Sequence, residues 1–212
     1  MNTTRRLEFV QRSLEHPRKR IIVYEPSDEQ AFIDIFSTPP HESNITTPTY
    51  VEGVGPCEIS TRALHWMALQ RANSHRPNFC ERFCYDFVAT FLKQDLEEDV
   101  SFRPTIHYLP SYDSIFVTGE IQPRINRVLL NTALILGTTS GDLCDDGRQL
   151  LDPEHSVIVV TESGKTPQLF MSKLGNKSGV FVHTLPTVAE LYDSTHYAEV
   201  QISDYRNPEM QS

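Results

Sequence analysis

The residues best suited to chemistry are concentrated between Pro56 and Leu92. This segment holds three of the four cysteines, two of the eight histidines and the only tryptophan. Cys57 follows Val-Gly-Pro at the start of a segment with helical periodicity, so we expect it to open a helix. The dipole of a helix N-terminus stabilises a thiolate and lowers the pKa of a cysteine. Cys57 is therefore a candidate nucleophile, with His155 on a later strand as its base and His183 as the second choice.

The order of these groups along the chain is similar in outline to that of the papain-like viral leader proteases. The run EHSVIVVTESG, which contains His155, adds to the likeness. The resemblance implies a cysteine protease with Cys57 as nucleophile and His155 as base. The chain departs from the family pattern at Glu58, which replaces the usual aromatic residue, and a neighbouring carboxylate raises the pKa of a thiol. The structural alternative for Cys57 is a small buried residue, which is what a free cysteine most often is.

A second cysteine pattern could bind zinc. Cys80 and Cys84 are four residues apart, and His75 with Cys57 or His65 could complete a tetrahedral set. Both cysteines, however, alternate with a row of phenylalanines within one helical segment. This arrangement favours packing in the core over metal binding.

The acidic turn within residues 138–154 is a third candidate ligand site. Asp142, Asp145 and Asp146 are crowded before Gly147. They lack the alternating spacing with which an EF-hand loop surrounds calcium, so the pattern indicates an exposed turn. We expect no bound metal and no other cofactor.

The elements that must position these groups change in character along the chain. Helical periodicity covers Cys57 to about Gln70 and Asn78 to about Gln94, and phenylalanines recur at every fourth position of the second segment, from 79 to 91. After Pro104 the chain consists of short β-type segments, spaced as in antiparallel hairpins. The expected fold class is α+β, with N-terminal helices packed on a C-terminal, mainly antiparallel β-sheet. Residues 128–136 fit a helix or a buried strand equally well.

A chain of 212 residues fits a single domain. Within it we distinguish a basic N-terminal arm, residues 1–56, and an α+β core domain, residues 57–212. The arm is expected to contain a short helix, a strand and a proline-rich loop at residues 37–56. Loops of this length in compact domains tend to be functional or disordered.

Charge is distributed unevenly along the chain. The net charge is −9, but residues 1–20 contain six basic and two acidic residues, a local charge of +4, which leaves −13 for the remainder. Because an acidic body repels phosphate, RNA or an anionic surface could be bound only through this basic segment. The alternative is a helix with a solvated basic face that packs on the acidic body. The candidate binding residues are Arg5, Arg6, Arg12, Arg18, Lys19 and Arg20.

The sequence contains no segment that resembles a membrane span or a secretory signal. Its apolar runs are far shorter than the ~20 residues that a membrane-spanning helix needs, and no apolar stretch follows the basic start. Four cysteines without a signal favour the cytoplasm or nucleus.

The function expected from these features is that of an intracellular accessory or regulatory protein, of the kind that viruses encode, which binds another macromolecule. A protein is the expected partner, and the basic segment, the loop at 37–56 and the acidic turn are the candidate contact surfaces. The papain-like cysteine protease is the alternative.

Overall fold

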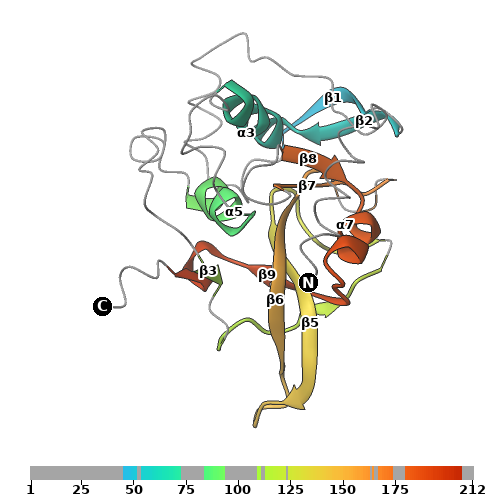
Figure 1. Ribbon diagram of the computed structural model, residues 1–212. Coiled ribbons are helices and arrows are strands. Elements are labelled where there is room, and N and C mark those ends of the chain that lie inside the picture. The colour runs from blue at the N-terminus through green and yellow to red at the C-terminus, as the bar shows by residue number, and fades with distance from the viewer. Residues whose placement is uncertain are drawn as a thin grey trace.

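A six-stranded antiparallel sheet forms the centre of the protein (Figure 1). The computed structural model describes residues 45–51, 54–72, 84–93, 109–110, 113–122, 124–162, 164, 167–173 and 180–206. In spatial order the central strands are β4 (Gly119–Glu120), β9 (His196–Val200), β5 (Ala133–Leu143), β6 (Gln149–Val159), β7 (Phe170–Lys173) and β8 (Val180–His183). Two smaller antiparallel pairs join β1 (Thr46–Val51) to β2 (Gly55–Ser60) and β3 (Leu109–Pro110) to β10 (Tyr205–Arg206). The helices among the described residues are α3 (Thr61–Ala72), α5 (Cys84–Lys93) and α7 (Leu185–Leu191), and η2 (Ile202–Asp204) is a short 3-10 turn.

The predicted fold class, α+β with N-terminal helices packed on a C-terminal sheet, is wrong. The described residues are 46% strand and 20% helix, and their three α-helices have only 12, 10 and 7 residues. The β1–β2 hairpin precedes α3 in the chain, and it takes up part of the predicted loop at residues 37–56. Side chains of a strand alternate between two faces, which gives the sequence a period of two residues. The prolines and glycines of this segment hide that period in the sequence. The hairpin also crosses residue 56, and residues 1–44 lie outside the described residues, so the division at 56 stays a prediction.

The predicted helix from Cys57 begins four residues later, at Thr61. Ser60 is the N-cap of α3, since its hydroxyl oxygen accepts a hydrogen bond of 3.1 Å from the backbone N–H of Ala63. The same hydroxyl donates to Oδ1 of Asn131 at 2.5 Å. This buried pair ties the start of α3 to the loop that leads into the sheet.

Residues 128–136, which fit a helix or a buried strand equally well in the sequence, lead into a strand: β5 begins at Ala133. Successive side chains of β5 enter two different cores. Ala133 and Ile135 belong to one cluster, whereas Leu134 and Leu136 belong to the other. All four are fully buried, so this strand carries a continuous apolar run in place of an alternating one. Periodicity therefore could not distinguish it from a buried helix.

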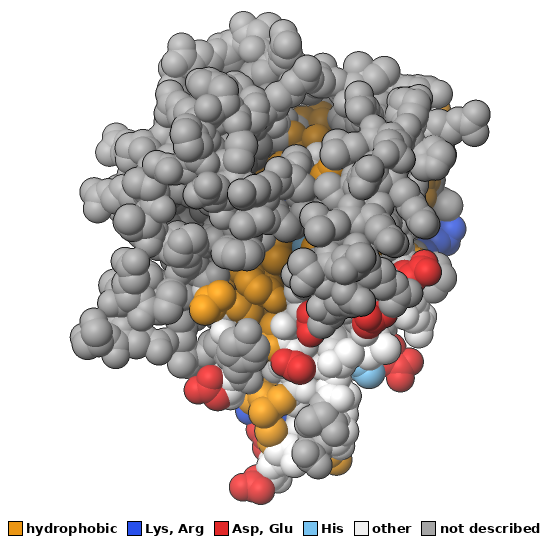
Figure 2. Space-filling model, in the orientation of Figure 1, with side chains coloured by type: hydrophobic (Ala, Val, Ile, Leu, Met, Phe, Trp, Pro, Cys, Tyr) orange, Lys and Arg blue, Asp and Glu red, His pale blue; other side chains and the backbone are white. Residues whose placement is uncertain are grey.

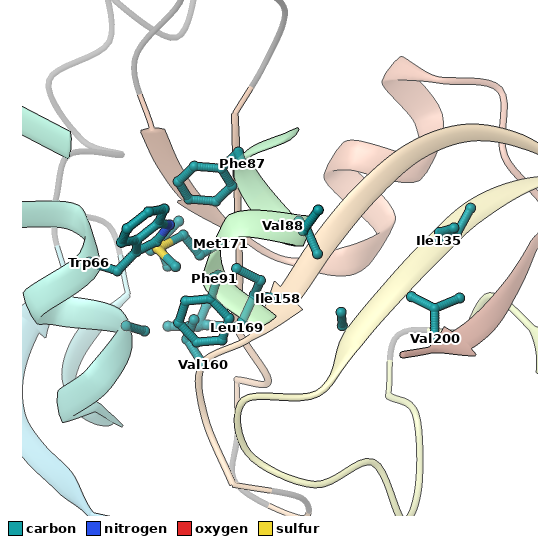
Figure 3. Packing of buried hydrophobic residues seen from close by; sticks show 14 of the residues in the cluster. Trp66, Phe87, Val88, Phe91, Ile135, Ile158, Val160, Leu169, Met171 and Val200 are labelled. Carbon is teal, nitrogen blue, oxygen red and sulfur yellow. The ribbon is translucent and has the colours of Figure 1, made fainter. Parts of the chain in front are cut away.

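The first core cluster contains the side chains of α3 and α5 and one face of the sheet (Figure 3). Trp66 packs against Phe87 and Phe91 of α5. The centroid of its ring lies 5.8 Å from that of Phe87 and 6.4 Å from that of Phe91. Phe87 and Phe91 are each 1% exposed, which confirms the predicted buried phenylalanine face for its described members. Phe79 and Phe83 lie outside the described residues. Trp66 is thus a packing anchor between the two helices.

Arg62 links α3 to the C-terminal turn of α5. Its side chain is fully buried, and Nη2 donates a 3.1 Å hydrogen bond to the backbone carbonyl of Phe91. The guanidinium also lies over the Phe91 ring, 5.0 Å from its centroid. A cation at this position complements the negative end of the helix dipole, although burial lowers the pKa of Arg62 to about 10. The two helices are therefore fixed to each other by polar as well as apolar contacts.

The second core cluster lies on the opposite face of the sheet. It contains Leu185, Val188 and Leu191 of α7, and Tyr192 directly after this helix. These side chains pack on Leu134 and Leu136 and on the side chains of β6 and β7 that point the same way. The central sheet is thus covered on both faces.

The hairpin of β5 and β6 extends beyond the rest of the sheet. We call residues 138–152 the hairpin arm. Within the sheet, β9 pairs with β5 only from Ala133 to Gly137, and β7 pairs with β6 only at Ile158 and Val159. Along the arm the two strands pair with each other, and the segment around Phe116 lies beside β6. Figure 1 shows the arm as a projecting ribbon.

Among the described residues, no helix has both the length and the apolar character that crossing a membrane requires.

Candidate functional site

Cys57 lies on strand β2, opposite Thr49 of β1, and not at the start of a helix. Its thiol is half-buried and packs against the first core cluster, to which Phe87 and Phe91 belong. Burial raises the pKa of Cys57, and the charge of Glu58 raises it further. A hydrogen bond with the Val51 backbone lowers the pKa, but by less than these two effects raise it. The dipole that was expected to activate the thiol does not act on it here. Cys57 is a weaker nucleophile at neutral pH than the sequence predicted.

His155 lies on the other side of the central sheet. It occupies β6 opposite Leu136, is fully buried, and stacks on Tyr192 with a centroid distance of 3.8 Å. Both Leu136 and Tyr192 belong to the second core cluster, whereas Cys57 packs against the first. The structure therefore does not bring Cys57 and His155 together. The sequence could not show this, because the face that each side chain occupies depends on strand register.

His183, the second choice for the base, also faces away from Cys57. It lies opposite Phe170 of the second cluster on the neighbouring strand. Its Nε2 is 2.7 Å from the hydroxyl of Ser172, and its Nδ1 is 3.2 Å from the carbonyl oxygen of Thr184. The carbonyl accepts the proton of Nδ1, so Nε2 of the neutral ring accepts the hydroxyl proton of Ser172.

The Ser172–His183 pair has the geometry of a nucleophile and its base. Ser172 is nevertheless fully buried, so a substrate has no access to its oxygen in this conformation. The pair joins β7 to the edge strand β8 on the face that α7 covers. Ser172 could not be identified from the sequence, because the pairing of two residues on separate strands depends on their register.

The reactivity of Cys57 gives a direct test of its environment. With its pKa raised, the thiolate fraction at neutral pH is below that of an ordinary thiol, so we expect alkylation by iodoacetamide to be slower in the folded chain than at the same cysteine in the unfolded chain. The rate should rise as the pH approaches the raised pKa. Glu58→Gln removes one cause of the shift and should increase the rate modestly. Peptide mapping by mass spectrometry resolves Cys57 from the other cysteines, and a rate equal to that of the unfolded chain would contradict the assigned environment.

The described residues contain no group of three or more His, Cys, Asp or Glu side chains placed to hold a metal ion. Cys84 is buried in α5, as expected for a core residue. Cys80 and His75 lie outside the described residues, and so do the six basic residues of the N-terminal segment. Their proposed roles stay predictions.

The acidic turn forms the end of the hairpin arm. We call residues 143–148 the hairpin tip. Two backbone hydrogen bonds close it, from Cys144 N–H to the Arg148 carbonyl at 2.7 Å and from Gly147 N–H to the Cys144 carbonyl at 2.8 Å. Gly147 has a φ of 78°, a left-handed conformation that glycine adopts without strain. The predicted exposed turn is confirmed at Asp145 and Asp146, which are both exposed.

Side chains fix the shape of the hairpin tip as well. Asp146 accepts hydrogen bonds from the backbone N–H of Arg148 at 3.0 Å and from its Nε at 2.6 Å. These bonds lower the pKa of Asp146. The Arg148 guanidinium in turn lies over the Phe116 ring, 3.6 Å from the centroid, so the tip is held to the neighbouring segment.

The hairpin tip presents an apolar side chain to solvent. Leu143 is 68% exposed, the highest value among the large exposed hydrophobic residues described. Asp145 and Asp146 of the tip are exposed, and Figure 2 shows further acidic side chains scattered over the lower half of the molecule. The tip thus combines a fixed backbone, an exposed leucine and negative charge.

Comparisons with known proteins do not identify this chain: no protein family model, no curated protein and no solved structure matches it.

Proposed function

We propose that the protein works by binding another macromolecule, with a protein as the expected partner, and that the hairpin tip is a contact surface. The observation that carries this proposal is the exposure of Leu143 at the end of a projecting arm. Burial of a leucine side chain at an interface stabilises a complex by about 1.5–3 kcal/mol. An exposed leucine at the end of a projecting arm is accessible to a partner from several sides.

The rigidity of the hairpin tip supports a binding role. Its backbone hydrogen bonds and the contacts of Arg148 with Asp146 and Phe116 hold the tip in one shape before any partner arrives. A preorganised surface loses little conformational entropy on binding. Cys57 packs against the first core cluster and His155 stacks on a residue of the second, so their placement supports a binding role better than the protease alternative.

The proposal predicts a specific effect of Leu143→Ser. We expect the affinity for a partner that co-purifies with the wild-type chain from its native cells to fall by about 10- to 100-fold, which corresponds to the loss of one buried leucine. Leu129→Ser is the matched control, because Leu129 is 62% exposed and lies on a different loop. The readout is the dissociation constant of each variant, with circular dichroism to confirm that both fold. Equal binding by the two variants would refute the contact role of the tip.

A further inference from the structure

We propose that His155 is an acid-sensitive switch: when its imidazole takes up a proton, helix α7 is released from the central sheet. The proposal does not depend on the contact role of the hairpin tip. It rests on the position of His155, which lies between the sheet and the residue that directly follows α7.

The imidazole of His155 is enclosed by the second core cluster. Its exposed fraction is 0%, and its neighbour across the strand pair is Leu136, which is also fully buried. Tyr197 of β9 lies next in the same row of the sheet. The Tyr192 ring stacks on the imidazole, with centroids 3.8 Å apart and an angle of 17° between the two planes. The end of α7 therefore covers His155 and separates it from water.

A positive charge on His155 is unfavourable in this position. Burial in an apolar environment disfavours the charged form of histidine. The face of Tyr192 and the C-terminal end of α7 both attract a cation, but complete removal from water is the larger effect. An imidazole in water takes up its proton at about pH 6.5. The covered state is therefore fully stable above about pH 6.5, and it loses stability relative to an open state as the pH falls below this value.

His155 is the fully buried histidine among the ionisable groups on the elements around it. Those groups are Glu154 on β6, Lys173 on β7, His183 on β8, Glu190 on α7, Tyr192 and Asp193 after α7, His196 and Tyr197 on β9, and Arg124 and Arg127 in the loop before β5. Lys173 alternates with Ser172 along β7 and so faces the first cluster. The carboxylates and the two arginines are exposed or half-buried, so water screens their charges. Between pH 5 and 8 histidine is the residue that changes charge, and His183 and His196 are only half-buried.

Helix α7 is the part of this core that opens most easily. It has only seven residues, and no side chain caps its N-terminus. Four buried side chains hold it to the sheet: Leu185, Val188, Ala189 and Leu191. Strand β6 is paired with β5 along most of its length and with β7 at its end. Because local opening begins at the least stable element, water reaches His155 by displacement of α7 and Tyr192, while the strands stay paired.

Backbone hydrogen exchange of the full-length chain, followed by NMR between about pH 5 and 8, tests the proposal. Protection factors remove the intrinsic dependence of exchange on pH. The reporters of α7 are the N–H of Tyr192, bonded to the Val188 carbonyl, and the N–H of Ser194, bonded to the Ala189 carbonyl. We expect their protection to fall by up to about tenfold per pH unit below about pH 6.5, the slope for one proton. The N–H of Val160, which is bonded within the sheet, should keep its protection.

Two variants separate His155 from the other histidines. His155→Phe keeps an aromatic ring against Tyr192 but cannot take up a proton, so the protection of α7 should no longer depend on pH. His196→Gln removes a half-buried histidine from β9 and should keep the pH dependence of the wild type. The same loss of protection in His155→Phe and in the wild type would overturn the proposal. No loss in the wild type, or an equal loss at Val160, would do so as well.

The side-chain NMR signals of His155 in the wild type give a readout that needs no variant. We expect the imidazole to become protonated over the same pH range in which α7 loses its protection. An imidazole that stays neutral while α7 opens would contradict the proposal. An imidazole that is protonated while α7 stays closed would contradict it too.

Discussion

Replacing Gly137 with alanine is expected to destabilise the chain by about 3 kcal/mol or more. A Cβ atom at this position would lie 1.9 Å from the backbone carbonyl oxygen of Asp152 on the paired strand. The register of β5 and β6 shifts between Leu136 and Gly137, and this irregularity brings the two backbones close together. Because the obstructing atom belongs to the backbone, a rotamer change cannot relieve the clash, and the base of the hairpin arm must open.

Gly141→Ala is the matched control for this substitution. Gly141 also lies on β5, and its Cβ would meet no atom within 4 Å, although its φ of 85° disfavours alanine. The expected loss is about 1–2 kcal/mol from backbone strain alone. Urea denaturation of both variants measures the difference, and equal losses would show that the close approach at Gly137 has no energetic consequence.

Truncation of Phe91 to alanine should cost about 3–5 kcal/mol, the range for a buried phenylalanine. The ring is 1% exposed, packs against Trp66 and lies beneath the guanidinium of Arg62. Its removal leaves a cavity between α3, α5 and the sheet and deprives the buried arginine of its aromatic partner. A loss of this size is a large part of the 5–15 kcal/mol that stabilises a typical domain.

Leu92→Ala, at the adjacent position, is the control for placing an alanine in α5 without removing the buried ring. Leu92 is only half-buried at the edge of the same cluster, so its truncation should cost about 1 kcal/mol. The two free energies of unfolding, measured by chemical denaturation, should differ clearly. Similar values would mean that the Trp66–Phe91 contact does not organise this core.

Several local features of the fold could be predicted from the sequence because they depend on short-range patterns. The phenylalanine spacing identified the buried face of α5, and the β-type run around Val157 corresponds to part of β6. The acidic turn was recognised from its crowded aspartates before Gly147. Each of these features depends on residues that are close together in the sequence. It could therefore be recognised without knowing which distant residues it contacts.

The features that the sequence did not predict depend on register between distant strands. The assignment of Cys57 and His155 to one site failed because a residue's face is set by its pairing and not by its order in the chain. The Ser172–His183 hydrogen bond and the close approach at Gly137 arise from the same pairing. The fold class was wrong because strands outweigh helices, and one pair of these strands, the β1–β2 hairpin, has prolines and glycines that are typical of a loop.

The contact role of the hairpin tip is tested most directly by photocrosslinking in the native cells. p-Benzoylphenylalanine is placed at position 143 in one variant and at position 129 in another, and both are irradiated where the protein is made. We expect a discrete crosslinked product from position 143 that is absent from position 129. Products that are the same at both positions, or no product from position 143, would contradict it.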